Sequence, residues 1–195
     1  IVEREHDADA IPREVLQTTK GAARPALSPD GQWLAFNSTE HQEDLFLINI
    51  DGSGFRQLTS DRARNRGPRW SPDGKRIAFF STRSGDWEIW TIDVAGGHMR
   101  QLTRLAGQNV AWPVWSQDGR RMAYTIFGVS TFVMEMAQEW DDQTPRKLPP
   151  MSGDGEIFNG WSWSPDGKTI AGFLNRGDGL ALYYPATQTY RRLSD

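Results

Sequence analysis

Three histidines, His6, His41 and His98, are the residues whose chemistry could hold a zinc ion or act as a general base. No two of them have the spacing of a zinc-binding pair, and no Ser-His-Asp constellation with credible geometry can be proposed around them. The chain also has no cysteine, which removes thiolate nucleophiles, Cys-ligated metals and disulfides. We therefore expect solvated histidines, no metal site and no cofactor.

Acid–base chemistry would need positioned carboxylates, and Asp154 and Glu156 lie in a long polar segment where such a pair could sit. Nothing distinguishes them from the residues of an ordinary polar loop. The glycines mark turns rather than a phosphate-binding loop, because no convincing helix follows any of them. We expect a chain without catalytic activity of its own, and a fused enzyme domain remains open.

Arginine gives the strongest binding signal, because Arg62, Arg64, Arg66 and Arg69 surround one connection and Arg83 lies on a loop of the same face. Guanidinium groups bind carboxylates in bidentate fashion and stack on aromatic rings, so an acidic protein or peptide partner would fit. The alternative is that the arginines are solvated and the aromatics pack between sheets. The expected partner-binding residues are Arg62, Arg64, Arg66, Arg83, Trp87, Trp112, Phe158 and Trp161.

Overall charge is slightly negative, with a net charge of −3 and an isoelectric point near 5.7. Such a balance argues against sequence-independent binding to nucleic acid or to anionic lipid. No apolar run approaches the ~20 residues that cross a bilayer, and the first residues show no leader pattern, so no membrane insertion is expected. A start at Ile1 suggests that an upstream part was removed or left out.

A tight turn of the Ser-Pro-Asp-Gly type recurs four times and indicates the elements that position these residues. The copies begin at positions 28, 71, 116 and 164, which are 43, 45 and 48 residues apart. Asp bonds the local backbone in such turns and Gly takes the positive φ, so we interpret these residues as structural. They are Asp30, Gly31, Asp73, Gly74, Asp118, Gly119, Asp166 and Gly167.

Each turn lies between strand-like runs, giving four short strands per repeat, which is typical of a β-propeller blade. Trp70, Trp115 and Trp163 directly precede their turns, and we expect them to fill the space between stacked blades. The expected fold is all-β, with four-stranded antiparallel blades at about 22–59, 66–103, 110–149 and 159–194.

The ring of blades is expected to be incomplete. Residues 1–14 would be a linker, and Val15–Thr19 would be an extra outer strand that has no blade within the propeller of residues 15–195. Open blade faces expose apolar surface and strand edges, so the chain would belong to a larger ring or complete one by self-association.

The second repeat, from Trp70 to Thr103, resembles the TolB-like β-propeller family. The matching motifs are Ser81-Thr82-Arg83-Ser84-Gly85, Ile89-Trp90, Asp93-Val94-Ala95-Gly96-Gly97 and Arg100-Gln101-Leu102-Thr103. The third repeat departs from the pattern between Glu135 and Thr144, and the fourth departs at its short connection from Pro185 to Thr189. The resemblance implies a ring of about six blades.

The resemblance leaves three functions open. The first is a scaffold that binds a protein or peptide through the face rich in loops, opposite the Ser-Pro-Asp-Gly turns. The second is a substrate-gating propeller of a larger hydrolase, either a serine peptidase or an amidohydrolase. The third is an extracytoplasmic sensor domain of a kinase or transcription regulator. We expect a periplasmic or extracytoplasmic location, and the absence of cysteine is also compatible with the cytoplasm.

Overall fold

Sixteen strands and one 3-10 helix make up the computed structural model, which describes residues 21–40, 42–151, 156–175 and 179–193. The strands form four antiparallel four-stranded sheets, and each sheet takes its strands in chain order. The predicted all-β fold is therefore confirmed. The expected linker 1–14 and the strand at Val15–Thr19 lie outside the described residues.

Each sheet is one blade of the predicted type. The first contains β1 (Ala22–Leu27), β2 (Trp33–Ser38), β3 (Leu45–Asn49) and β4 (Arg56–Gln57). The second contains β5 (Asn65–Trp70), β6 (Arg76–Ser81), β7 (Glu88–Asp93) and β8 (Met99–Gln101). The third contains β9 (Val110–Trp115), β10 (Arg121–Ile126), β11 (Ser130–Glu135) and β12 (Arg146–Lys147), with the helix η1 (Trp140–Asp142) before β12. The fourth contains β13 (Phe158–Trp163), β14 (Ile170–Leu174), β15 (Leu180–Tyr184) and β16 (Thr189–Arg192).

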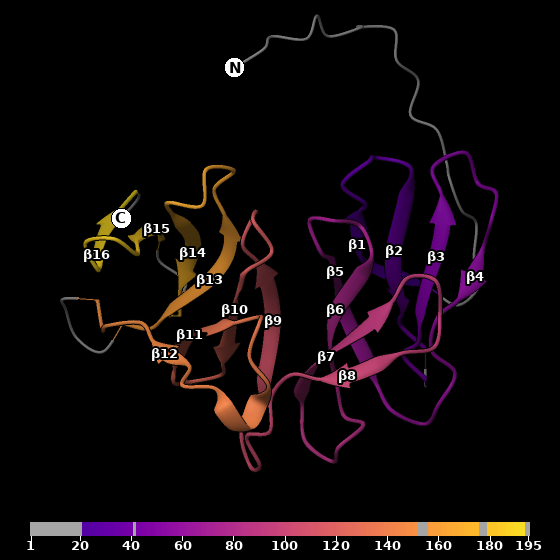
Figure 1. Ribbon diagram of the computed structural model, residues 1–195, viewed down its shortest axis with the longest axis horizontal. Helices are drawn as coiled ribbons and strands as arrows, with labels where there is room; N and C mark the ends of the chain where they lie inside the picture. Colours follow the sequence, from indigo (N-terminus) through magenta and orange to yellow (C-terminus); the bar gives the residue numbers. More distant parts are fainter. Residues whose placement is uncertain (1–20, 41, 152–155, 176–178, 194–195) are drawn as a thin grey trace, which may run out of the picture.

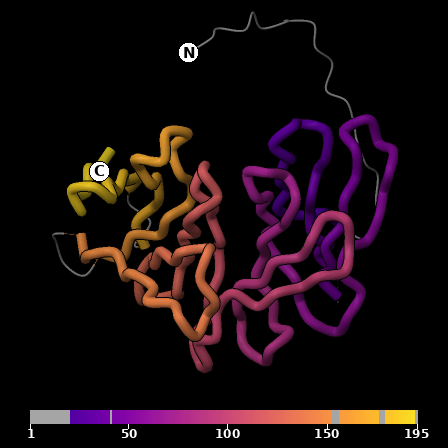
Figure 2. Tube along the Cα trace, viewed as in Figure 1, coloured from indigo at the N-terminus to yellow at the C-terminus, as the bar shows by residue number. Residues whose placement is uncertain are grey.

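The four blades follow one another across the molecule, from the indigo blade of β1 to the yellow blade of β16 (Figure 1). The tube view traces the same succession from one end of the row to the other (Figure 2). The first strands of successive blades contact each other in the order β1, β5, β9 and β13, so these are the inner strands. The blades form a partial propeller.

Apolar cores lie between the blades rather than within them. Leu47 of the first blade packs with Phe79 of the second, and Phe80 of the second packs with Met122 of the third. A blade is a single sheet and cannot bury its own faces, so stacking supplies most of the apolar burial. Within the described ranges, no helix is long and apolar enough to cross a bilayer.

Tryptophans before the turns connect neighbouring blades, as predicted. The indole Nε1 of Trp70 donates to the carbonyl of Ala26 at 3.0 Å, and that of Trp115 donates to the carbonyl of Arg69 at 3.3 Å. Each ring therefore adds a hydrogen bond to the apolar area that it buries between two blades. In the first blade Leu27 takes the corresponding place and is 56% exposed.

The Ser-Pro-Asp-Gly turns share one hydrogen-bond pattern. In the second blade the Ser71 hydroxyl donates to Asp73 at 2.6 Å, and Asp73 also accepts from the backbone N–H of Lys75 at 3.1 Å. These bonds lower the pKa of Asp73, chiefly through the Ser71 hydroxyl. Gly74 has a φ of +68°, in the left-handed region that glycine adopts without strain. The carboxylate is thus engaged within its turn.

Each of the first two blades has a buried acidic side chain that accepts hydrogen bonds on the loop side. Asp44 accepts from the Thr59 hydroxyl at 2.9 Å, and in the second blade Glu88 accepts from the Thr103 hydroxyl and from the N–H of Leu105. Burial raises the pKa of Glu88. In the third blade Ser130 stands in the register position of Glu88, and Pro149 follows the outer strand where Thr103 does. The acid and its threonine are therefore absent together from that blade.

Candidate functional site: an arginine–tryptophan cluster on the inner strands

A β-bulge interrupts every inner strand at one repeat position. The pairing register shifts between Ala23 and Ala26 in β1, and at the corresponding places in β5, β9 and β13. Three of these strands have a left-handed residue there: Arg24 (φ 53°), Gly67 (φ 60°) and Trp112 (φ 57°). Bulges re-aim side chains, and a left-handed conformation costs free energy for residues other than glycine. Arg24 and Trp112 hold that conformation and lie in contact with each other.

These bulges bring together side chains from all four blades. The Arg24 guanidinium lies 5.8 Å from the centre of the Trp112 ring, and the Trp112 and Trp161 rings are 4.9 Å apart. Arg69 lies over Trp161 at 5.5 Å. We call Arg24, Arg69, Trp112 and Trp161 the inner cluster. Its members come from β1, β5, β9 and β13, so its assembly requires that the blades stack in order.

Arg69 is a half-buried cation without a carboxylate partner among the described residues. Its guanidinium donates to the carbonyl of Pro68 at 3.4 Å and otherwise lies against Trp161. Burial lowers the pKa of Arg69, because the charged form has lost part of its hydration. Arg24 likewise has no carboxylate partner in the described part of the chain. The inner cluster thus presents two cations that no acid of the described chain neutralises.

A second group of aromatic contacts joins the inner cluster to the loop side. Phe80 lies 5.1 Å from Trp112 and 5.2 Å from Trp87, and Arg66 lies over Trp87 at 4.8 Å. Unlike Arg69, Arg66 is neutralised, because Glu43 accepts from its Nε and, at 2.7 Å, from its Nη2. Stacking on a ring orients a guanidinium without removing its charge. Arg66 is paired with Glu43 of the first blade, whereas the Arg24 and Arg69 guanidinium groups have no carboxylate partner in the ranges that the structure describes.

The remaining predicted arginines are dispersed along the loop side. Arg83 pairs with Asp61 at 2.5 Å and lies over Trp90 at 5.4 Å. Arg62 and Arg64 are exposed, and Arg64 borders a polar cavity of about 470 Å³ with Glu40 and Glu43. These carboxylates already balance much of the positive charge there. The loop arginines therefore give a weaker electrostatic site than the pair on the inner strands.

Phe158 does not lie where a partner could reach it. Its side chain is 2% exposed, belongs to the core between the third and fourth blades, and contacts the Tyr190 ring at 5.3 Å. It opens β13 on the strand face that packs against the third blade, which the repeat spacing alone did not reveal. The expectation of an accessible anchor at Phe158 is corrected to a core role. Trp161, three residues later, is 42% exposed.

The groups considered for catalysis are dispersed or lie outside the described residues. No set of three His, Cys, Asp or Glu side chains that could hold a metal occurs in the ranges that the structure describes. His98 is exposed in the turn between β7 and β8, while His6, His41 and Asp154 lie outside the described residues. Glu156 pairs with Arg192 at 3.2 Å.

Arg24 is a functional candidate that the sequence did not predict, because it stands apart from the arginines between Arg62 and Arg69. A signal was present. Arg24, Gly67 and Trp112 each stand four positions before the serine of a Ser-Pro-Asp-Gly-type turn. When the repeats are aligned on that serine, Arg24, Gly67 and Trp112 fall at one position. The three residue types differ there, although the three backbones share a left-handed conformation.

Similarity to known proteins extends over most of the chain. The family model described as TolB beta propeller domain matches residues 6–185. The dipeptidyl-peptidase 5 of Porphyromonas endodontalis is 33% identical over 119 residues, which is 57% of this chain and 17% of that protein. The Tol-Pal system protein TolB of Rhizorhabdus wittichii is 42% identical over 69 residues, which is 34% of this chain and 16% of that protein.

Among solved structures, TolB from Acinetobacter baumannii superposes with a TM-score of 0.70 at 23% identity. The match covers 93% of this chain and 45% of that one, and at this identity it shows the fold alone. This chain spans only part of the length of these relatives. Because the family model covers most of the chain and all four described blades have the expected form, the chain belongs to the TolB β-propeller domain family.

Proposed function

We propose that this chain is a non-catalytic scaffold that binds an acidic protein or peptide segment at the inner cluster. The observation that carries the proposal is Arg69, a half-buried guanidinium that lies over Trp161 and has no carboxylate partner among the described residues. Keeping an unpaired cation out of water is unfavourable, and a carboxylate from a partner would offset that penalty.

The aromatic members supply what such an interface needs besides charge. Trp161 is 42% exposed and lies beside Trp112, so it offers apolar area next to two cations. Interface hot spots are enriched in tryptophan and arginine surrounded by groups that exclude water. The favoured partner segment therefore has a carboxylate for Arg69 or Arg24 and an apolar or aromatic side chain for Trp161. In keeping with the family, we place the protein in an extracytoplasmic compartment.

A peptide array tests this proposal on the 195-residue chain. Ten-residue peptides carry one to three acidic residues and one aromatic residue at varied positions, each beside its amide counterpart. We expect binding only where an acid is present, and loss of that binding in the Arg24→Gln, Arg69→Gln double variant. The matched control is Arg120→Gln, Arg191→Gln, which removes two exposed arginines outside the cluster and changes net charge equally. Unchanged binding in the cluster variant, or equal loss in the control, would overturn the proposal.

A second candidate is a substrate-filtering propeller of a larger peptidase. It is favoured by the 33% identity over 119 residues to dipeptidyl-peptidase 5. In that setting the same inner cluster would sort peptide substrates by charge before they reached a separate catalytic domain. A Gly-x-Ser-x-Gly motif in the same reading frame, outside these 195 residues, would favour this candidate over the scaffold.

A further inference from the structure

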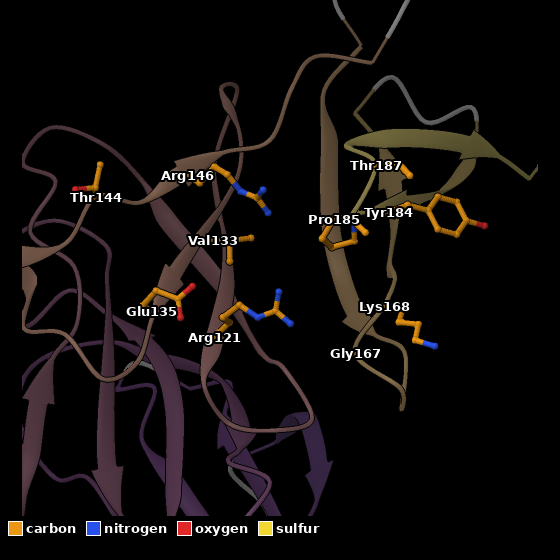
Figure 3. A pocket seen from close by; sticks show the side chains of 11 residues that line it. Arg121, Val133, Glu135, Thr144, Arg146, Gly167, Lys168, Tyr184, Pro185 and Thr187 are labelled. Carbon is orange, nitrogen blue, oxygen red and sulfur yellow. The ribbon is translucent and has the colours of Figure 1, made fainter.

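A cavity of about 700 Å³ opens between the third and fourth blades, on the side of the Ser-Pro-Asp-Gly turns (Figure 3). Arg121, Glu135 and Arg146 line it from the third blade, and Lys168, Tyr184 and Pro185 line it from the fourth. Both arginine side chains extend from the third blade into the space that faces the fourth (Figure 3). Three cations and one acid give the cavity a net positive charge, and its volume suits a short peptide segment.

All four blades carry an equivalent arginine in the outer strand, and in the first three blades this arginine faces the next blade of the described chain. Arg56 lies opposite Leu47, Arg100 opposite Thr91 and Arg146 opposite Val133 in their sheets. Arg56 donates to the carbonyl of Val94, in the turn of the next blade, at 2.5 Å. A repeat protein tends to reuse such a contact at each junction, since neighbouring blades meet in the same geometry.

The second junction has the same contact with a carboxylate added. Arg100 donates to the carbonyl of Gln138 at 3.3 Å and pairs with Glu139 at 2.8 Å, both in the segment between β11 and β12 of the next blade. At the first two junctions, therefore, this arginine binds a turn of the next blade. The turn offers a backbone carbonyl to Arg56, and a backbone carbonyl and a carboxylate to Arg100.

The third junction offers Arg146 no such turn. The fourth blade connects β15 to β16 through a short turn, from Tyr184 to Thr189, in place of the longer segment between Glu135 and Arg146 in the third. Within the described residues the Arg146 guanidinium makes no hydrogen bond or ion pair, although its backbone pairs with Val133 in the sheet, and the cavity occupies the space in front of the side chain. Arg121 is held in place over the Trp163 ring at 4.8 Å.

We propose that this cavity binds a peptide segment of a partner protein whose glutamate or aspartate pairs with Arg146, in the place that a blade turn fills at the second junction. Lys168 and Arg121 add favourable charge, and Glu135 limits the site to segments that are not strongly acidic. The site lies on the opposite side of the propeller from the connection that joins Arg66 to the inner cluster, and it does not depend on the function proposed above.

The probe is a blocked, dye-labelled peptide with the sequence of residues 136–140, Met-Ala-Gln-Glu-Trp, which includes the Arg100 contact segment. Its control has glutamine in place of glutamate. Fluorescence anisotropy with the 195-residue chain should show at least tenfold tighter binding of the glutamate peptide. Arg146→Gln should abolish that preference, Arg146→Lys should retain part of it, and Arg100→Gln, whose guanidinium Glu139 already occupies, should keep it within twofold.

Thermal unfolding of each variant separates loss of binding from loss of fold. Arg146→Gln should melt like the wild-type chain because its guanidinium has no partner to lose among the described residues, so its binding result can be interpreted directly. Three results would overturn the proposal: equal binding of the two peptides, no binding at millimolar peptide, or the same loss of preference in Arg100→Gln and Arg146→Gln.

Discussion

Arg69 on β5 lies 5.5 Å from the centre of the Trp161 ring on β13, although the two residues belong to the second and fourth blades. The inner strands face one another closely enough for side chains to meet across a whole intervening blade. That blade contributes Trp112, which contacts Trp161 and the Arg24 guanidinium. The cluster is therefore a property of the assembled propeller rather than of any one repeat.

Replacing Arg69 by methionine should leave stability close to that of the wild-type chain or raise it. The guanidinium is half-buried and has no carboxylate partner in the described part of the chain, so its removal recovers desolvation cost while methionine keeps contact with Trp161. We expect a free energy of unfolding no more than about 1 kcal/mol below wild type, measured by urea denaturation. The matched variant Arg66→Met leaves Glu43 unpaired and should lose about 1–3 kcal/mol. A larger loss in Arg69→Met than in Arg66→Met would contradict a binding role for Arg69.

Gly67→Ala should destabilise the second blade more than the same change in a turn glycine. Gly67 has a φ of +60°, and an added Cβ would lie 2.6 Å from Cε1 of Phe80, which packs against Trp87 and Trp112. Gly167 has a φ of +68° with no atom within 4 Å of such a Cβ, so Gly167→Ala measures the backbone cost alone. We expect about 1 kcal/mol for Gly167→Ala and a further 1–3 kcal/mol, roughly, for Gly67→Ala. Equal losses in urea denaturation would show that Phe80 moves aside freely.

Because Glu88 is buried, the free energy of unfolding should fall as the pH rises above the ordinary pKa of a glutamate. Burial raises the pKa of Glu88 in the folded chain, so the native state holds a proton that the unfolded state releases. The stabilisation that protonated Glu88 contributes is therefore fully present below the pKa of Glu88 in the unfolded chain. It is lost as the pH rises through the pKa of Glu88 in the folded chain. Compared with Glu88→Gln, the wild-type chain should gain stability as pH falls from 7 towards about 4.5. A stability difference that stays constant across this interval in urea denaturation would contradict the raised pKa.

The isolated chain should self-associate through its terminal blade faces. Phe173, Leu180 and Leu193 surround an apolar cavity of about 350 Å³ on the fourth blade, and Leu180 is 55% exposed. Trp161 of the inner cluster also lines this cavity, so a second chain and a bound partner segment would compete for it. Contiguous apolar surface of this kind tends to be covered by another protein surface. Static light scattering should give a mass above that of one chain, and Phe173→Lys, Leu180→Lys should lower it. Phe127→Lys, at an exposed apolar residue outside this face, should not. A wild-type chain that remains monomeric at high concentration would refute the expectation.

Repetition explains why the sequence predicted the blades so well. Residues equivalent to Ser71, Asp73 and Gly74 occur in the turn of every blade, and their hydrogen bonds are local. The spacing of these residues alone therefore locates the turns and the strands beside them. The contact between Trp70 and Ala26 could be anticipated for a similar reason, since one large residue recurs at a position that must pack between sheets.

The candidate site was predicted less completely because it depends on distances between blades. Arg66, Trp87, Trp112 and Trp161 were expected to share a surface, and a chain of ring contacts through Phe80 does join them. No repeat period indicates that β1 and β9 lie close enough for Arg24 to contact Trp112, or that Phe158 points into the core. Those facts follow from the curvature of the row of blades and from the bulges, which are three-dimensional properties.

A double-mutant cycle directly measures whether Arg69 binds a carboxylate of the partner segment. Isothermal titration calorimetry gives four affinities: the wild-type chain and Arg69→Gln, each with the best acidic peptide of the array and with its amide counterpart. We predict a coupling free energy of about 1.5 kcal/mol or more, as expected for a close pair of opposite charges at an interface. A coupling within about 0.3 kcal/mol of zero would show that Arg69 does not bind the carboxylate.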